Sequence, residues 1–221
     1  GYGVVVNGAY GLAEFEYIEK GSEFEAQANN YTLNAEAANA ALDTTPYLYE
    51  ADGTTKWDPA KAQAAYEADK ENFDYWRHDE EGNRLRVMHA GSTNNEVSDL
   101  ISVQLPDNTK KVGMQYIFNP VPFNTLLDHF YYPNAADPDA ASVFNMGTGF
   151  DSLHDNYYQY HSSQIGVGDN TNRLADPEVD KILEDARHVD PSDKENWLNG
   201  WLQFNLWYND NLPNIPLYAN Q

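Results

Sequence analysis

The stretch that decides the fold is residues 174–220, LADPEVDKILEDARHVDPSDKENWLNGWLQFNLWYNDNLPNIPLYAN. Asp176-Pro177 predicts a helix start, because an aspartate side chain caps free backbone N–H groups and proline fits the first helical turn. The residues that follow form one apolar stripe at helical spacing: Val179, Ile182, Leu183 and Ala186.

Asp190-Pro191 repeats this start signal and predicts a second helix, with Trp197, Trp201, Phe204 and Tyr208 on one face. Residues 209–213 should end that helix, and residues 215–218 read as a short extended run. Its tryptophans, Trp207 included, are predicted to lie in the core. Two helices with this much apolar surface need a sheet or another partner to bury it.

Composition places the 221 residues among globular proteins, with 41% hydrophobic and 14% aromatic residues. The net charge of −22 disfavours nucleic acid and anionic membrane as partners, because both would be repelled. There are no cysteines, so disulfides and thiolate metal sites are excluded. No run approaches the length of a membrane span, and the opening GYGVVVNGAYG is not a signal peptide.

The rest of the chain alternates between helix and strand signals. Helices are expected at 33–42, from Asp58-Pro59 toward residue 73, from Asn95 to an early end or kink at Pro106, and at 123–130. Extended segments are expected at 4–6, in a hairpin over 75–89 that turns at 80–83, at 114–118 and at 142–147. This alternation predicts an α/β fold, with a mixed β-sheet flanked by helices.

Three motifs resemble family 5 extracytoplasmic solute-binding proteins, the peptide-, dipeptide- and nickel-binding receptors of ABC importers. They are the PEVDKIL to NLPNIPLY pattern of residues 177–218, the hairpin EGNRLRV at 81–87, and KKVGM at 110–114. The resemblance implies a type II periplasmic-binding-protein fold. It also implies that residues 1–221 are a single domain, the second lobe of a two-lobe protein whose first lobe is not part of this sequence.

A ligand site is expected just after the strand at 142–147, because α/β sheets bind ligands beyond the carboxyl ends of their strands. The family resemblance implies that an aspartate of this segment pairs with the α-ammonium group of a peptide ligand. Asp155 lies at about that position, and Asp151 is a nearby candidate. A carboxylate in a closing cleft gains from an ammonium partner. A surface carboxylate that caps a turn is the alternative interpretation of Asp155.

Aromatic residues of the same segment complete the predicted site. Tyr157, Tyr158 and Tyr160 offer flat faces for a ligand, or pack under the loop, and Phe150 stands where peptide binders usually carry a tryptophan. His154 and His161 flank the tyrosines, so a metal or general-base role is conceivable there, but no HExxH pattern or close histidine pair supports it. We expect no metal and no cofactor.

The prediction is therefore a binding protein without catalytic activity: the ligand-binding lobe of an ABC-transporter receptor for peptides or a similar polar solute. It would close over its ligand with the first lobe and deliver it to a permease. The expected location is extracytoplasmic, with membrane contact only through a lipid anchor outside this chain, as in a lipoprotein. A fragment of an extracellular carbohydrate-active hydrolase, or a carbohydrate-binding module, is the alternative.

Overall fold

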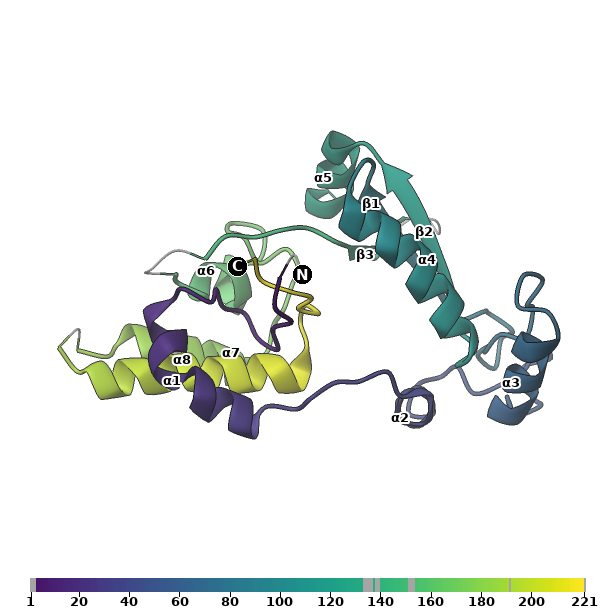
Figure 1. Cartoon of the computed structure of the whole chain (residues 1–221), viewed down its shortest axis with the longest axis horizontal. Coiled ribbons are helices and arrows are strands. Elements are labelled where there is room, and N and C mark those ends of the chain that lie inside the picture. Colours follow the sequence, from purple (N-terminus) through teal and green to yellow (C-terminus); the bar gives the residue numbers. More distant parts are fainter. Residues whose placement is uncertain (1–2, 133–136, 138–139, 151–153, 191, 221) are drawn as a thin grey trace. The chain divides into compact units, whose positions relative to one another are not determined.

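The computed structural model describes residues 3–132, 137, 140–150, 154–190 and 192–220. The chain divides into two compact units. The sheet unit comprises Thr32–Gly147, and the helical unit combines Gly1–Tyr31 with Thr148–Gln221 (Figure 1). Whether residues 1–221 act as one lobe of a larger protein stays a prediction.

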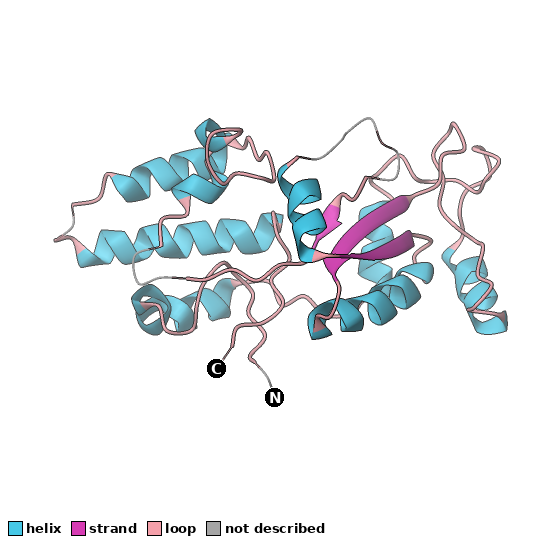
Figure 2. Ribbon diagram, turned by 90° about the horizontal axis from the view of Figure 1, so that it is seen from above, coloured by secondary structure: helices cyan, strands magenta, loops and turns pink. Residues whose placement is uncertain are grey.

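The sheet unit confirms the predicted α/β fold with flanking helices. Its elements in chain order are α2 (Ala35–Leu42), α3 (Pro59–Ala68), β1 (Arg86–Ser92), α4 (Glu96–Lys110), β2 (Gln115–Val121), α5 (Phe123–Tyr131) and β3 (Val143–Phe144). The strand order is β2-β1-β3, and both strand pairs of the described residues are parallel, whereas a mixed sheet was expected. Figure 2 shows the strands in magenta with helices against them.

Three helices of this unit start at the predicted caps. The side chains of Asn34, Asp58 and Asn95 each accept a hydrogen bond from a backbone N–H in the first turn of α2, α3 and α4. Such caps satisfy donors that have no partner inside the helix, which is why the signal can be read locally from sequence.

Several predictions about this unit are wrong in extent. Helix α3 ends at Ala68, whereas it was expected to continue toward residue 73. Helix α4 continues through Pro106 to Lys110, whereas an end or kink was expected at the proline. Packing of α4 along β2 outweighs the missing N–H bond. The buried strand expected over 142–147 is only the two residues Val143 and Phe144, which are half-buried.

A buried polar network fixes the end of β3 against β1. His89, 2% exposed, contacts the Tyr116 hydroxyl through Nδ1 at 2.6 Å and Asn145 Oδ1 through Nε2 at 3.0 Å. Asn145 Nδ2 donates to the hydroxyl of Ser98 on α4 at 3.1 Å. Burial lowers the pKa of His89 and raises that of Tyr116 to about 12, so both groups are neutral at pH 7.

Arg77 holds the other end of the sheet unit together. Its side chain is 2% exposed, pairs with Asp43 at 2.8 Å and lies over the ring of Trp57 at 4.2 Å. The expected hairpin is reduced to a bridge between His78 and Arg84, because the chain then enters the parallel sheet as β1.

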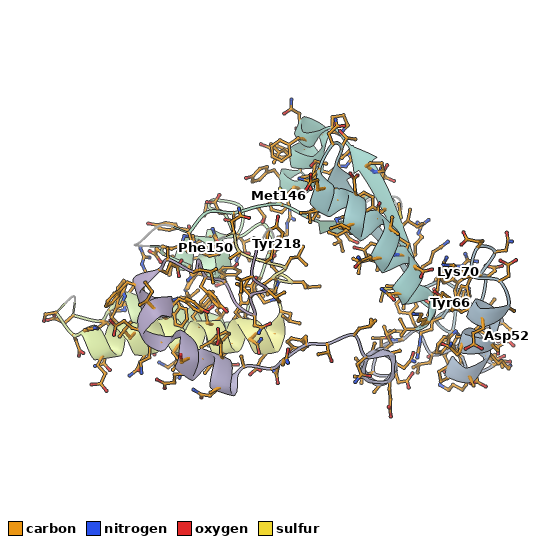
Figure 3. The ribbon with its side chains drawn as sticks, in the orientation of Figure 1. Asp52, Tyr66, Lys70, Met146, Phe150 and Tyr218 are labelled. Carbon is orange, nitrogen blue, oxygen red and sulfur yellow. The ribbon has the colours of Figure 1, made fainter. Side chains whose placement is uncertain are left out.

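A hydrogen bond from α3 and an ion pair from the segment just after it both reach Asp107 on α4. Figure 3 labels Tyr66 and Lys70, which both contact Asp107, at 2.8 and 3.9 Å.

The helical unit contains α1 (Phe15–Gln27), α6 (Tyr157–Tyr160), the 3-10 helix η1 (Ser162–Gln164), α7 (Pro177–Arg187) and α8 (Lys194–Asn211). Helices α7 and α8 pack together, and α1 packs against α8. Gly200 permits the close approach of α7, since a Cβ there would lie 3.0 Å from the Cβ of Ala186. The predicted cap Asp176 accepts from Glu178 N at 2.8 Å.

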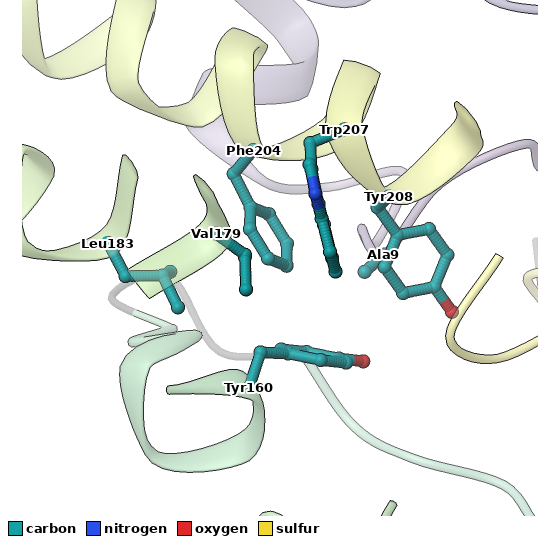
Figure 4. Close-up of a cluster of buried hydrophobic side chains, with 7 residues drawn as sticks. All are labelled: Ala9, Tyr160, Val179, Leu183, Phe204, Trp207 and Tyr208. Carbon is teal, nitrogen blue, oxygen red and sulfur yellow. The ribbon is translucent and has the colours of Figure 1, made fainter. Parts of the chain in front are cut away.

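The core of this unit joins α7 and α8 to α6 and the N-terminal segment. Figure 4 shows its seven buried side chains, Ala9, Tyr160, Val179, Leu183, Phe204, Trp207 and Tyr208. The apolar faces of the two helices are thus buried against helices and an extended segment of their own unit, and in this unit no strand of the described residues covers them.

Several details of the predicted α8 are wrong. The helix begins at Lys194 with Asp193 as its cap, because Asp190 instead accepts from Ser192 N at 2.8 Å in a local turn. Its end at Asn211 falls within the break expected over 209–213. Trp197 is 39% exposed, outside the core, and its indole N–H donates to Glu16 on α1 at 2.8 Å.

Two buried asparagines of α8 hold the N-terminal segment, and the sequence analysis missed both. Asn205 Oδ1 accepts from Ala9 N at 2.9 Å. Asn209 Oδ1 accepts from Asn29 N at 2.7 Å, while its Nδ2 donates to Asn7 O at 3.0 Å and Asn29 O at 3.2 Å. Both side chains are at most 1% exposed.

The first and last parts of the helical unit also pair directly. Val4 and Ala219 exchange two backbone hydrogen bonds of 2.9 and 2.8 Å as an isolated antiparallel bridge. This single bridge is what the structure shows of the extended runs expected at 4–6 and 215–218. Over the residues that the structure describes, no helix has the length and apolar character of a bilayer span.

Candidate functional site

The predicted site residues that the structure describes lie in the helical unit, at residue 150 and on the segment 154–164 beside the end of α7. Tyr160 anchors this segment: it is 5% exposed and packs on Phe204 at 5.3 Å between ring centroids, so it lies in the core and offers no face to a ligand. Its hydroxyl accepts from Asn214 Nδ2 at 3.1 Å. The neighbouring side chains are therefore displayed from a fixed turn. Asp151 lies outside the described residues.

Asp155 makes two different contacts with its two carboxylate oxygens. Oδ1 accepts from Tyr157 N at 3.0 Å, which is the turn-capping contact considered as an alternative. Oδ2 lies 3.2 Å from Nε of Arg187, the last residue of α7. The cap fixes the orientation of the carboxylate, and the second oxygen faces a cation.

Tyr157 and Tyr158 contact the same arginine. The guanidinium carbon of Arg187 lies 4.1 Å from the ring centroid of Tyr157 and 5.4 Å from that of Tyr158. Arg187 Nη2 also donates to the Tyr158 hydroxyl at 3.5 Å, a long hydrogen bond. Asp155, Tyr157 and Tyr158 thus surround one positive charge, and we call these three residues the cation cage.

His161 supports the cage from within the unit. Its ring stacks on Tyr157, with centroids 4.2 Å apart, and its Nε2 lies 3.3 Å from Glu184 Oε1. Since Ser163 N donates to Nδ1 at 3.1 Å, Nδ1 is an acceptor and the ring proton of the neutral form sits on Nε2, toward Glu184. His161 is 6% exposed, so it orients Tyr157 and is not itself presented to a ligand.

Phe150 and His154 form a separate pair. Their rings meet edge to face at 5.0 Å, and Phe150 also packs against the buried cluster of Figure 4. Close contact with Gly11 holds it there, since a Cβ at that glycine would lie 3.0 Å from the Phe150 Cβ. His154 Nε2 is buried and has no hydrogen-bond partner among the described residues. A ligand role for these two residues stays a prediction.

No acidic or histidine cluster in the described part of the chain has the geometry of a metal site. A surface hollow of about 480 Å³ lies between α7 and the start of α8, lined by Asp185, Asp190 and Asp193 among others. The cage residues do not line it. The site is therefore a surface arrangement of a carboxylate, two phenol rings and an arginine.

Sequence reasoning missed Arg187, and it named His161 only as a flank of the tyrosines with a conceivable metal or general-base role, not as the ring that orients Tyr157. The only signal for Arg187 is a basic residue at the end of a confident helix, which is common because cations stabilise helix C-termini. Its contact with Asp155 depends on how the segment 154–160 folds back on α7, and local patterns carry no information about that.

Comparison with known proteins identifies chains that this one resembles in sequence and fold. No protein-family model matches the chain. The oligopeptide-binding protein AppA of Bacillus subtilis is 27% identical over 140 residues, which are 63% of this chain and 25% of AppA. Its structure in complex with a nonapeptide matches 99% of this chain and 37% of AppA, with a TM-score of 0.69 and 20% identity. The chain is related to part of a family 5 solute-binding protein.

Other solved structures give the same fold. The oligopeptide-binding protein of Thermus thermophilus, complexed with a pentapeptide, has a TM-score of 0.70 and 16% identity, covering 100% of this chain and 34% of that protein. The mannohexaose-bound oligopeptide-binding protein of Thermotoga maritima has a TM-score of 0.65 and 17% identity, covering 99% and 36%. This chain spans about a third of the length of these family 5 structures.

The family 5 relatives carry names that describe binding and not a reaction, which supports the prediction that the chain is not an enzyme. The sheet flanked by helices in this chain matches part of the oligopeptide-binding protein fold.

Proposed function

We propose that this chain supplies one ligand-binding lobe of an ABC-importer receptor for peptides or a similar polar solute. The observation that carries the proposal is the sequence match to the oligopeptide-binding protein AppA together with the same fold over 99% of the chain. The lobe would close over its ligand with a first lobe and present the closed form to a permease.

The cation cage supports a peptide-like ligand. A carboxylate whose Oδ2 faces a cation, beside two phenol rings, suits an ammonium or guanidinium group by charge and by cation–π attraction. We assign Asp155 the ligand ammonium, and Tyr157 and Tyr158 the adjoining surface. Phe150, His154 and Asp151 complete the proposed site from the same segment.

An oligosaccharide is the second ligand class. The relative from Thermotoga maritima carries mannohexaose on the same fold, so fold alone does not select the ligand. Aromatic faces suit sugar rings as well as peptides, whereas the carboxylate of Asp155 is better matched by a cation.

The location that fits this function is extracytoplasmic, as a receptor held at the membrane by a lipid anchor outside this chain. Extending the gene in both directions tests this part of the proposal. A leader with a lipid-anchoring cysteine, a first-lobe sequence and neighbouring permease genes are expected, and a catalytic domain in their place would contradict it.

Binding is tested on the full-length protein by calorimetric titration with a pool of nonapeptides and, separately, with mannohexaose. We expect heat from the peptides, and a weaker response in Asp155→Asn. The matched control is Asp185→Asn, since Asp185 is an exposed carboxylate on α7 paired only with Lys181 in the described residues. Binding of mannohexaose alone would move the assignment to sugars, and binding of neither probe would refute it.

A further inference from the structure

We infer that Arg187 is a built-in competitor in the cation cage, which a ligand must displace with its own ammonium or guanidinium group. This inference rests on the proposed function and names the ligand class more closely: solutes that carry a free positive charge. Arg187 would then be a specificity-determining residue, because uncharged ligands could not replace it beside Asp155.

The geometry of the cage is that of an occupied cation site. Arg187 offers Nε to Asp155 Oδ2 at 3.2 Å, while its guanidinium plane lies over Tyr157 at 4.1 Å. The Tyr157 N–H holds Asp155 Oδ1, so the oxygen that faces the cation is set in place by the backbone and does not depend on the arginine. The carboxylate and rings therefore keep their positions when Arg187 leaves.

Arg187 is also held loosely enough to be displaced. Its side chain is 41% exposed and that of Asp155 37%, and exposed pairs of this kind contribute little to stability. Its hydrogen bond to the Tyr158 hydroxyl is long, at 3.5 Å.

Arg77 shows the opposite case in the same chain. That side chain is 2% exposed and donates to Val112 O at 3.1 Å and Asn39 Oδ1 at 3.1 Å, besides its ion pair with Asp43 at 2.8 Å. Arg77 is a structural arginine that no ligand could replace, whereas Arg187 has few contacts and water on one side.

Displacement predicts that Arg187 affects charged and neutral ligands differently. A neutral ligand over the tyrosines would have to leave the Arg187–Asp155 pair intact and bind outside it. A ligand ammonium can take the Oδ2 contact and release the arginine side chain to water. Removing the arginine should therefore favour cationic ligands selectively, by about three- to tenfold in affinity, the range that exposed ion pairs and cation–π contacts allow.

The test uses the full-length protein, with one nonapeptide in two forms: a free α-amino group and an acetylated one. Arg187→Gln is expected to tighten binding of the free form by about three- to tenfold and to leave the acetylated form unchanged. Lys181→Gln is the matched control, because it removes the same charge from an exposed position on the same helix. In Arg187→Gln combined with Asp155→Asn the gain should vanish.

These outcomes separate the inference from the proposed function. If the free form binds and Arg187→Gln weakens it or changes both forms equally, the competitor role is wrong while peptide binding stands. If neither form binds the wild-type protein, peptide binding is wrong, and a second measurement decides the cage. The Arg187 Nε–H signal, assigned by ¹⁵N NMR from its loss in Arg187→Gln, is followed during titration with glycinamide.

Glycinamide should move that signal toward its position in Asp155→Asn, and sodium chloride at matched ionic strength should not. Equal shifts with glycinamide and with sodium chloride, or no shift with glycinamide, would overturn the inference whatever the ligand of the whole protein is.

Discussion

The side chain of Asn209 offers the sharpest stability test, because one buried residue holds three backbone groups of another segment. Its Oδ1 accepts from Asn29 N at 2.7 Å, and its Nδ2 donates to Asn29 O and Asn7 O at 3.2 and 3.0 Å. The residue is 1% exposed, so water cannot replace these contacts in the folded state. In Asn209→Ala the N–H of Asn29 and two carbonyls lose their side-chain partner together.

The expected loss follows from the number of contacts. Each hydrogen bond is worth about 1 kcal/mol net, and buried groups left without partners add to the cost, so Asn209→Ala should lower the free energy of unfolding by about 3 kcal/mol. For a chain of this size that corresponds to a fall in Tm of roughly 6–12 °C. Asn211→Ala is the matched control: Asn211 is exposed, and its side chain contacts only Trp207 O of its own helix in the described structure, at 3.0 Å.

Urea unfolding measures the free energies, and hydrogen exchange of the Asn29 amide tests the cause. We expect Asn209→Ala to accelerate exchange at Asn29 far more than at the centre of α8, and Asn211→Ala to leave it unchanged. A loss below about 1 kcal/mol, within the range of a single exposed hydrogen bond, would refute the reasoning. So would an Asn29 amide that stays protected, since its protection is attributed to the Asn209 side chain.

Three further predictions test other parts of the fold. Burial raises the pKa of Glu14 from 4.5 to about 7, so its stabilising contribution is present below pH 4.5 and is lost as the pH rises to about 7. The free energy of unfolding should therefore fall between pH 5 and 8, and Glu14→Gln should remove up to roughly 3 kcal/mol of that fall. Equal pH profiles of the two proteins in urea unfolding would contradict this. Leu126, 0% exposed beside the sheet, should cost about 2–5 kcal/mol when changed to Ala, measured by the same unfolding, and a loss under 1 kcal/mol would show that the site is not packed. Gly113 has φ +71° and a Cβ there would lie 2.7 Å from the ring of Trp57, so Gly113→Ala should destabilise the protein by more than about 1 kcal/mol, and an unchanged Tm would refute the close approach.

The parts of this fold that sequence predicts are those with local causes. Caps at Asn34, Asp58, Asn95 and Asp176 each mark a helix start, because cap and helix are adjacent in the chain and the hydrogen bond forms within a few residues. The α/β alternation of the sheet unit follows from the same local signals.

Helix α1 shows the limit of local signals. It was missed because Glu14, at its start, makes no side-chain cap in the described structure, and because Phe15 and Ile18 are exposed at 42% and 69%. Its stability comes instead from packing of Phe24, 0% exposed, and of Trp201 on α8. A helix fixed by distant partners leaves little trace in its own sequence.

The candidate site depends both on local signals and on a distant partner, and the excess of acidic over basic residues shows why the partner matters. With 35 acidic and 13 basic residues, any one carboxylate is weak evidence for a site, since most carboxylates lie at the surface and face water. The positions of the few basic side chains are more informative. Arg77 is buried and has a structural role. Arg187 is half exposed and lies over two tyrosines that contact no other cation in the described residues. Family resemblance selected Asp155 as the group that needs a positive partner. Sequence could not show that the chain itself supplies this positive partner, Arg187. The affinity of a ligand therefore depends on how well its positive group competes with Arg187 for Asp155.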